Sequence, residues 1–208
     1  MDRLAVDVVL LPDETMTNRA IEINKRLVRD YPQEIVLDQR TGLPHISLAM
    51  GGIDETDIGA IGQSLEESAQ KTAVRQLRII GVLSSTNPRG QTTSVLEVER
   101  TDALQALHER IMRETKPFFR YEVTEDMILS DVVAPSTLDW IRNYPQKAGY
   151  EHFSPHITLG YGTLPADVSF PIPFTVTRLA LCHLGNHCTC RQLLAAARME
   201  EWNGGTVE

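Results

Sequence analysis

Two histidines lie in nearly identical pentapeptides, one in each half of the chain. The first reads Pro44-His45-Ile46-Ser47-Leu48, and the second reads Pro155-His156-Ile157-Thr158-Leu159. Side chains alternate between the two faces of a strand, so each copy places an imidazole and a hydroxyl on one face and two aliphatic side chains on the other. If the two halves pack about a pseudo-twofold axis, the two polar faces meet across a cleft.

Such a pair of imidazoles suits the hydrolysis of a phosphodiester. One imidazole must take a proton from the attacking water, and the other must give a proton to the departing ribose oxygen. Histidine titrates near neutrality, so one ring can be neutral while its partner is charged. Hydroxyl groups can donate hydrogen bonds to the non-bridging phosphate oxygens. The motifs therefore predict His45 and His156 as the acid/base pair, and Ser47 and Thr158 as phosphate-binding residues.

The repeated His-x-Ser/Thr-hydrophobic motif resembles the signature of the two-histidine (2H) phosphoesterases, which include proteins named 2′,5′ RNA ligases and cyclic phosphodiesterases. The likeness covers both motifs, their separation (156 − 45 = 111 residues) and the coarse order of elements. It implies a duplicated α+β fold around a bilobal cleft, catalysis without a metal, and 2′,3′-cyclic phosphate ends or small cyclic nucleotides as substrates. Many family members place a basic residue soon after the second motif, where this chain has Gly160-Tyr161-Gly162.

The expected function is metal-independent hydrolysis of a small 2′,3′-cyclic phosphodiester, either a cyclic nucleotide or an RNA end, by a monomer. Two alternatives stay open: a non-catalytic module that binds a nucleotide or RNA end, and an activity like that of the RNA 2′,5′ ligases. Ring opening of nucleoside 2′,3′-cyclic phosphates separates the enzyme from the binding module. Three aromatic residues, Trp140, Phe153 and Tyr161, are candidates to stack on a base.

The apolar pattern predicts helices that alternate with short strands. Helices are expected at 14–31, 54–71, 101–117 and 136–144, and strands at 4–11, 35–37, 45–50, 74–83, 94–98, 156–161, 176–184 and 187–195. This order recurs in the two halves. It predicts one domain over 1–208, built as a duplicated bilobal α+β unit in which two antiparallel-rich sheets line a central cleft and helices pack outside. Residues 118–153 have no counterpart in the first half and are a candidate lid, and residues 203–208 are an expected frayed tail.

Composition narrows the classes of partner. The chain has 208 residues, 42% of them hydrophobic, which suffices for a sizeable core. Its net charge of −8 opposes long-range attraction to a phosphate polymer, so long duplex nucleic acid is not an expected partner. The apolar run from Leu4 to Leu11 contains Asp7 and is far shorter than a membrane span. With no signal-peptide pattern either, a cytoplasmic protein without membrane contact is expected.

A cluster of potential metal ligands lies near the C-terminus. With Gly185-Asn186 as a two-residue hairpin turn, the ligands divide between the two faces of the hairpin. Four ligands then cannot converge, so we expect no metal and no cofactor, with a zinc site as the alternative. The three cysteines are expected to be free and reduced, as small, half-buried strand residues. The cluster comprises Cys182, His183, His187, Cys188 and Cys190.

Overall fold

The structure, a computed structural model, describes residues 2–30, 35–87, 90–164 and 169–199. The expected tail, the expected end of the first helix at Tyr31, and Pro88-Arg89, between the strands expected at 74–83 and 94–98, lie outside the described residues. No helix in the described part of the chain is long and apolar enough to span a membrane.

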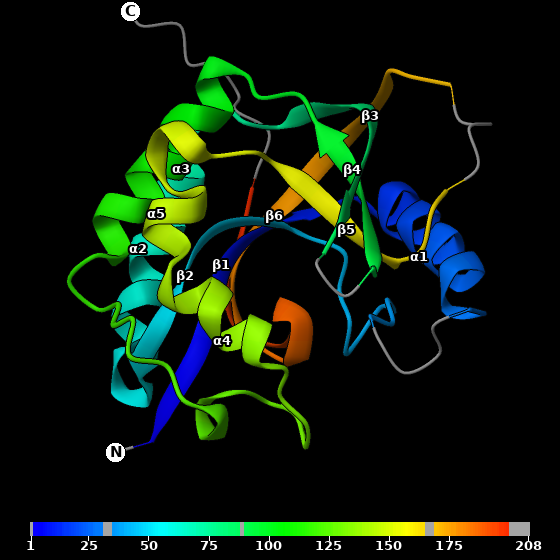
Figure 1. The fold of residues 1–208 in the computed structure, drawn as a ribbon. Coiled ribbons are helices and arrows are strands. Elements are labelled where there is room, and N and C mark those ends of the chain that lie inside the picture. The colour runs from blue at the N-terminus through cyan, green and yellow to red at the C-terminus, as the bar shows by residue number, and fades with distance from the viewer. Residues whose placement is uncertain (1, 31–34, 88–89, 165–168, 200–208) are drawn as a thin grey trace, which may run out of the picture.

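Seven strands and five α-helices make up the regular structure of the described residues (Figure 1). In chain order they are β1 (Arg3–Pro12), α1 (Glu14–Val28), β2 (Ile46–Asp54), α2 (Ile58–Lys71), β3 (Gln76–Thr86), β4 (Thr92–Val98), α3 (Asp102–Thr115), α4 (Pro135–Arg142), α5 (Tyr144–Ala148), β5 (His156–Tyr161), β6 (Ile172–Leu184) and β7 (Cys190–Arg198). The predicted α+β class is confirmed.

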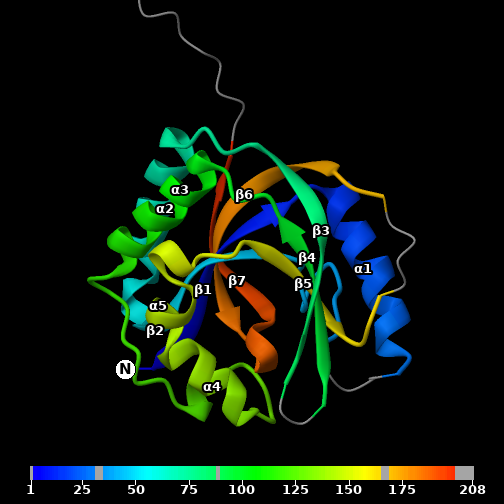
Figure 2. The ribbon, with the colours of Figure 1, turned by 45° about the horizontal axis from the view of Figure 1, so that its top comes forward.

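Strand β6 joins the two antiparallel halves of the sheet. Its residues 176–183 pair with β1, and its residues 172–175 pair with β3. The strand order is β2-β1-β6-β3-β4-β5, with β7 paired to β6, so the two motif strands stand at opposite ends of the path. The path curls, and β2 and β5 contact each other (Figure 2). Residues 111 positions apart in the chain are thereby brought to one place.

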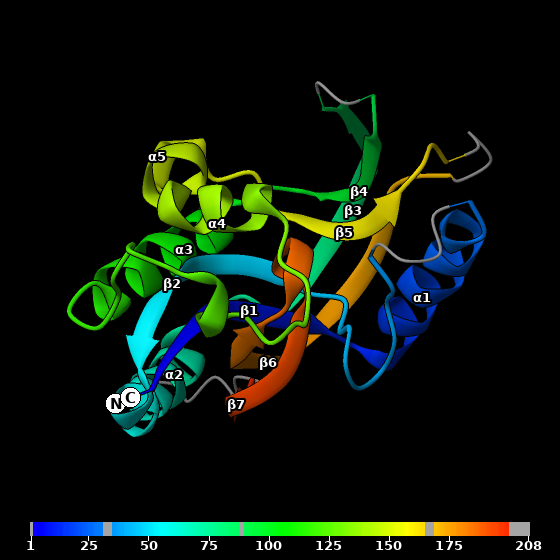
Figure 3. The same ribbon diagram turned by 60° about the horizontal axis from the view of Figure 1, so that its bottom comes forward.

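Each motif strand is covered by a helix that comes from the other half of the chain. Helix α1 packs on β5 and α3 packs on β2, and the two helices lie on opposite sides of the molecule (Figures 1 and 3). Helix α1 begins at the N-cap Asp13, whose carboxylate accepts from the amide of Met16. Helix α3 begins in the same way at Thr101, whose hydroxyl accepts from the amide of Leu104.

A buried polar side chain fixes each helix to its strand at an equivalent motif position. Asn24 of α1 donates to the Leu159 carbonyl at 2.6 Å, and His108 of α3 donates through Nδ1 to the Leu48 carbonyl at 2.8 Å. The Nε2 atom of His108 accepts from the Tyr150 amide, so the ring is neutral. Burial lowers the pKa of His108 to about 4, which favours the same state.

Two expectations about strands were wrong, for different physical reasons. Residues 35–37 form no strand, because the Asn24 side chain donates to the Ile35 carbonyl and accepts from the Leu37 amide in place of a neighbouring strand. The strand expected at 45–50 does not end before Gly51-Gly52 but runs on, as β2, to Asp54. A Cβ atom at Gly51 would lie 2.7 Å from the Phe119 ring, so glycine here permits close packing rather than a turn.

Substitution of Asn24 tests the coupling between α1 and β5. Asn24→Ala leaves two carbonyls and one amide without their partner in a buried site, so the free energy of unfolding should fall by at least about 2 kcal/mol. Asn18→Ala removes an exposed amide from the same helix and should change it by less than about 0.5 kcal/mol. Chemical denaturation of both variants measures the difference, and equal effects would contradict the role given to Asn24.

Candidate functional site

The four residues singled out from the motifs line one cleft of about 670 Å³. His45 immediately precedes β2, and His156 is the first residue of β5. Ser47 and Thr158 follow on the same face of their strands, as the alternation of side chains requires. The curl of the sheet therefore brings together two imidazoles and two hydroxyls.

The two imidazoles are held in the same way. His45 Nδ1 lies 2.7 Å from the carbonyl oxygen of Leu43, and His156 Nδ1 lies 2.7 Å from that of Ser154. A carbonyl oxygen only accepts, so each Nδ1 carries the hydrogen. In the neutral ring the lone pair is then on Nε2. Each Nε2 can take a proton when its ring is neutral and give one when its ring is charged.

The cleft disfavours charge on both rings at once. Burial lowers the pKa of His45 to about 4; the bond to Leu43 opposes this shift, and positive charge on His156 adds to it. Burial also lowers the pKa of His156, against the bond to Ser154. The two imidazoles are therefore close enough for charge on His156 to disfavour charge on His45.

The rest of the cleft wall is largely apolar and aromatic. Trp140 and Tyr144, from the expected lid segment 118–153, form part of it, as do Phe153 and Tyr161. The expected helix at 136–144 is present as α4, and residues of α4 line the cleft. Among the described residues that line the cleft, none is lysine or arginine.

The hairpin of β6 and β7 differs from the expected one. Leu184 pairs with Cys190, so the turn spans residues 185–189 instead of Gly185-Asn186 alone. The pairing also contains two register shifts. Since a one-residue slip moves a side chain to the other face, the expected division of ligands between the faces was wrong. His187 and Cys188 adopt left-handed backbone conformations in this turn, with φ of 56° and 55°, and both line the cleft.

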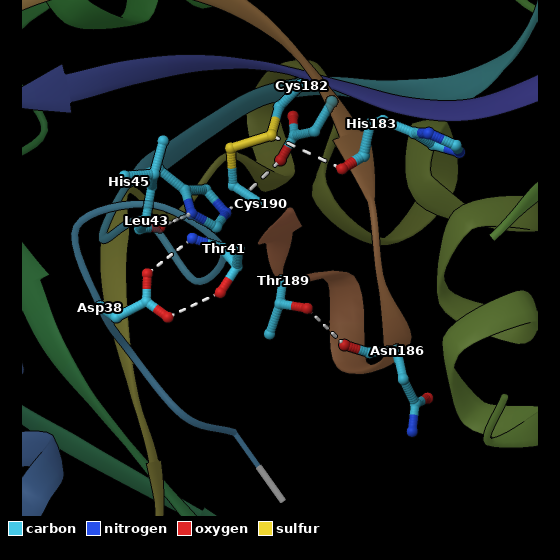
Figure 4. The surroundings of a disulfide bond; sticks show 10 residues. Asp38, Thr41, Leu43, His45, Cys182, His183, Asn186, Thr189 and Cys190 are labelled. Carbon is cyan, nitrogen blue, oxygen red and sulfur yellow. Dashed lines mark hydrogen bonds and ion pairs between the residues drawn. A yellow bond between two sulfur atoms is a disulfide. The ribbon is translucent and has the colours of Figure 1, made fainter. Parts of the chain in front are cut away.

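Cys182 and Cys190 form a disulfide, which corrects the expectation of three free cysteines (Figure 4). Cys188 is the free cysteine of the described residues. The disulfide removes two thiolates from the possible zinc ligands, and the described residues contain no group of three or more His, Cys, Asp or Glu side chains arranged to hold a metal.

The disulfide supports the loop that carries His45. The Leu43 amide donates to the Cys190 carbonyl at 3.1 Å, while the Leu43 carbonyl accepts from His45 (Figure 4). The turn itself is tied to α4, because Asn186 Oδ1 accepts from the Ala134 amide and from the Thr137 hydroxyl. The loop that holds the His45 imidazole is thus bonded to the start of β7, which the disulfide links to β6.

Asp7 is a site residue that the sequence analysis missed. Its side chain is fully buried, and Oδ2 lies 3.8 Å from His45 Nε2. Burial raises the pKa of Asp7 well above its usual value; contacts with the Ser47 hydroxyl and the Ala49 amide oppose this. The available signal was a single carboxylate inside the apolar run Leu4 to Leu11, where an unpaired charge is costly.

Comparison with known families identifies the class of protein. Residues 28–187 match the model of the 2′-5′ RNA ligase superfamily, which is more than half of the chain. The chain therefore belongs to this superfamily of 2H phosphoesterases, as the two motifs indicate. A comparison with curated protein sequences gave no match.

Solved structures with the same architecture include the Thermus thermophilus protein TT0787, with a TM-score of 0.58 and 16% identity over 94% of this chain and 98% of that one. At these levels the likeness shows the fold. The E. coli protein LigT in its apo form gives a TM-score of 0.48 at 13% identity, over 97% of this chain and 100% of LigT. LigT complexed with 3′-AMP gives a TM-score of 0.45 at 14% identity, over 96% of this chain and 100% of LigT.

Nuclear magnetic resonance of the imidazoles tests the electrostatics of the cleft. The His45 resonance, assigned with His45→Gln, should titrate with a midpoint near pH 4. In His156→Gln this midpoint should rise, because the neighbouring positive charge is gone. A His45 midpoint near that of free histidine, or one that does not respond to His156→Gln, would contradict the arrangement described.

Proposed function

We propose that the protein hydrolyses a small 2′,3′-cyclic phosphodiester without a metal, with His45 and His156 as the acid/base pair. The observation that carries the proposal is the arrangement of the two rings, since each imidazole is locked by its Nδ1 hydrogen bond and both line one cleft. Membership in a superfamily of phosphoester chemistry supports the same reaction class.

The reaction needs two proton transfers at one phosphorus atom. One Nε2 takes a proton from water as the water oxygen attacks phosphorus, and the other Nε2 gives a proton to the ribose oxygen as its bond to phosphorus breaks. The hydroxyls of Ser47 and Thr158 donate to the non-bridging oxygens, on which negative charge is stabilised. The product is a nucleoside monophosphate with an opened ring.

The chemistry of the cleft wall favours a substrate with one phosphate. The described lining has aromatic and aliphatic side chains that suit a base or ribose, and no lysine or arginine to neutralise further phosphates. The net charge of −8 also disfavours a substrate with many phosphates. A nucleoside 2′,3′-cyclic phosphate fits these conditions better than the end of a long RNA.

A substrate panel tests the proposal. The wild-type protein should open the ring of at least one nucleoside 2′,3′-cyclic phosphate, with higher kcat/KM than for an oligonucleotide that carries the same cyclic end. Binding of the cyclic nucleotide without any product would support the non-catalytic module instead. Joining of RNA ends in place of ring opening would support the ligase-like alternative.

Substitution of the two histidines tests whether they act as a unit. His45→Ala and His156→Ala should each lower kcat by about 10²- to 10⁴-fold. The double variant should be little worse than either single one, since groups that act in one concerted step are strongly non-additive. The wild-type rate should pass through a maximum with pH, because one ring must be neutral and the other protonated. Additive losses, or a rate that only climbs with pH, would show separate roles.

The hydroxyls should contribute less than the imidazoles. Ser47→Ala and Thr158→Ala each remove one hydrogen bond to a charged phosphate, worth about one to two decades in rate. The exchanges Ser47→Thr and Thr158→Ser keep the hydroxyl and serve as matched controls, with most of the activity retained. Alanine variants as active as their controls would remove these hydroxyls from the phosphate site.

A further inference from the structure

Asp7 is a buried carboxylic acid beside one imidazole of the pair. It lies in β1, opposite Met50 of β2 and Cys182 of β6 in the strand register. Its side chain is fully buried, and neither carboxylate oxygen has a partner with hydrogen-bonding geometry in the described structure. Among the described residues, the one basic group that approaches it is His45, whose Nε2 lies 3.8 Å from Oδ2.

The surroundings of Asp7 contain no fixed positive charge among the described groups. Three other side chains interact electrostatically with Asp7. The Ser47 hydroxyl lowers the pKa of Asp7, and negative charge on Asp7 raises the pKa of the Tyr144 phenol and of the Cys188 thiol. On the remaining elements packed against β1, His183 bonds to the Met127 carbonyl, and Glu125 and Asp126 are exposed to solvent. Ionised Asp7 therefore has one possible counter-charge, a protonated His45.

Asp7 and His45 are close enough to hold one proton between them. An isolated carboxylate in such a site is strongly disfavoured, so Asp7 holds a proton when His45 is neutral. When His45 is charged, Asp7 is the carboxylate that faces it. In both states the pair is neutral overall and carries one transferable proton. A neutral His45 ring without Asp7 would carry only the proton on Nδ1 and would have no proton on Nε2 to transfer.

His156 has no buried carboxylate paired with it in this way among the residues that the structure describes. No carboxylate in the described structure forms an ion pair with it. Glu97 is its register partner on β4, and the Glu97 carboxylate lies against Gly81 of β3. Burial favours the neutral His156 ring, whose Nε2 lone pair can accept a proton. The two imidazoles are thus alike in geometry and unlike in their surroundings.

We propose that Asp7 is a positioning residue that keeps a proton on the His45 side of the cleft, so that His45 is the general acid and His156 the general base. The proposal rests on the proposed function. Water loses a proton to His156 Nε2 as its oxygen bonds to phosphorus. The ribose oxygen leaves and takes the proton from His45 Nε2. The proton gained by His156 then returns through solvent to the Asp7/His45 pair.

The leaving group separates the acid from the base. A nucleoside 2′,3′-cyclic phosphate releases an alkoxide that needs a proton, whereas bis(4-nitrophenyl) phosphate releases a phenolate that does not. Asp7→Asn should lower kcat on the cyclic nucleotide by about 10²-fold with little change in KM. On the aryl ester, the fold-decrease in kcat caused by Asp7→Asn or by His45→Ala should be at least about tenfold smaller than on the cyclic nucleotide. His156→Ala should lower kcat by the same factor on both substrates.

The opposite pattern would overturn the proposal. Equal losses for Asp7→Asn on the two substrates, or a His156→Ala defect that the aryl leaving group relieves, would assign the acid to His156. If the wild-type protein hydrolyses neither ester, the proposed function itself fails, together with the assignment of the acid.

The stability of the protein tests the proton on Asp7 without any substrate. The Asp7 pKa is raised in the fold, so its contribution to stability is present below the unfolded pKa and is lost as pH rises through the folded pKa. Asp7→Asn removes this loss, so its melting temperature should exceed that of the wild type by a margin that grows with pH. Asp54→Asn, in an exposed pair with Arg3, should show no such trend. A margin that is absent or independent of pH would overturn the role of Asp7.

Discussion

The hydrogen bond from each imidazole Nδ1 to the carbonyl two residues earlier is the interaction on which the site depends. It sets the tautomer of both His45 and His156 and leaves each Nε2 as the reactive atom. Proline lies between the carbonyl and the histidine in both motifs, and its fixed φ restricts the backbone at this point. The geometry is therefore built locally, within three residues, and twice. What the remainder of the fold must do is bring the two copies to a common cleft.

The sheet and its covering helices meet that requirement. The motif strands are the two ends of the strand path, and they meet because the path curls. Asn24 and His108 satisfy the carbonyls of Leu159 and Leu48, the same position in each motif, from helices of the opposite half. Both anchors are buried and polar, so they fix the register of helix on strand more narrowly than apolar contacts do. The halves match in these contacts but differ at Asp7, and this difference distinguishes the chemistry of the two histidines.

The sequence was sufficient for whatever depends on local pattern. The alternation His-x-Ser and His-x-Thr predicted the shared faces, and the apolar spacing predicted most helices and strands to within a few residues. It failed where a side chain replaces a backbone partner, as Asn24 does at residues 35–37. It failed again in the β6–β7 hairpin, where the turn is longer than two residues, the pairing contains two register shifts, and Cys182 and Cys190 form a disulfide. Asp7 was visible only as an interruption of an apolar strand, because its nearness to His45 arises from the pairing of β1 with β2.

The most direct test of the central claim is a crystal structure with a nucleoside vanadate, whose trigonal-bipyramidal centre imitates phosphorus during in-line attack. We expect the vanadate in the cleft, with Nε2 of His45 and Nε2 of His156 at hydrogen-bonding distance from opposite apical oxygens and the hydroxyls of Ser47 and Thr158 on the equatorial ones. A vanadate that contacts only one of the two imidazoles, or that binds outside this cleft, would contradict it.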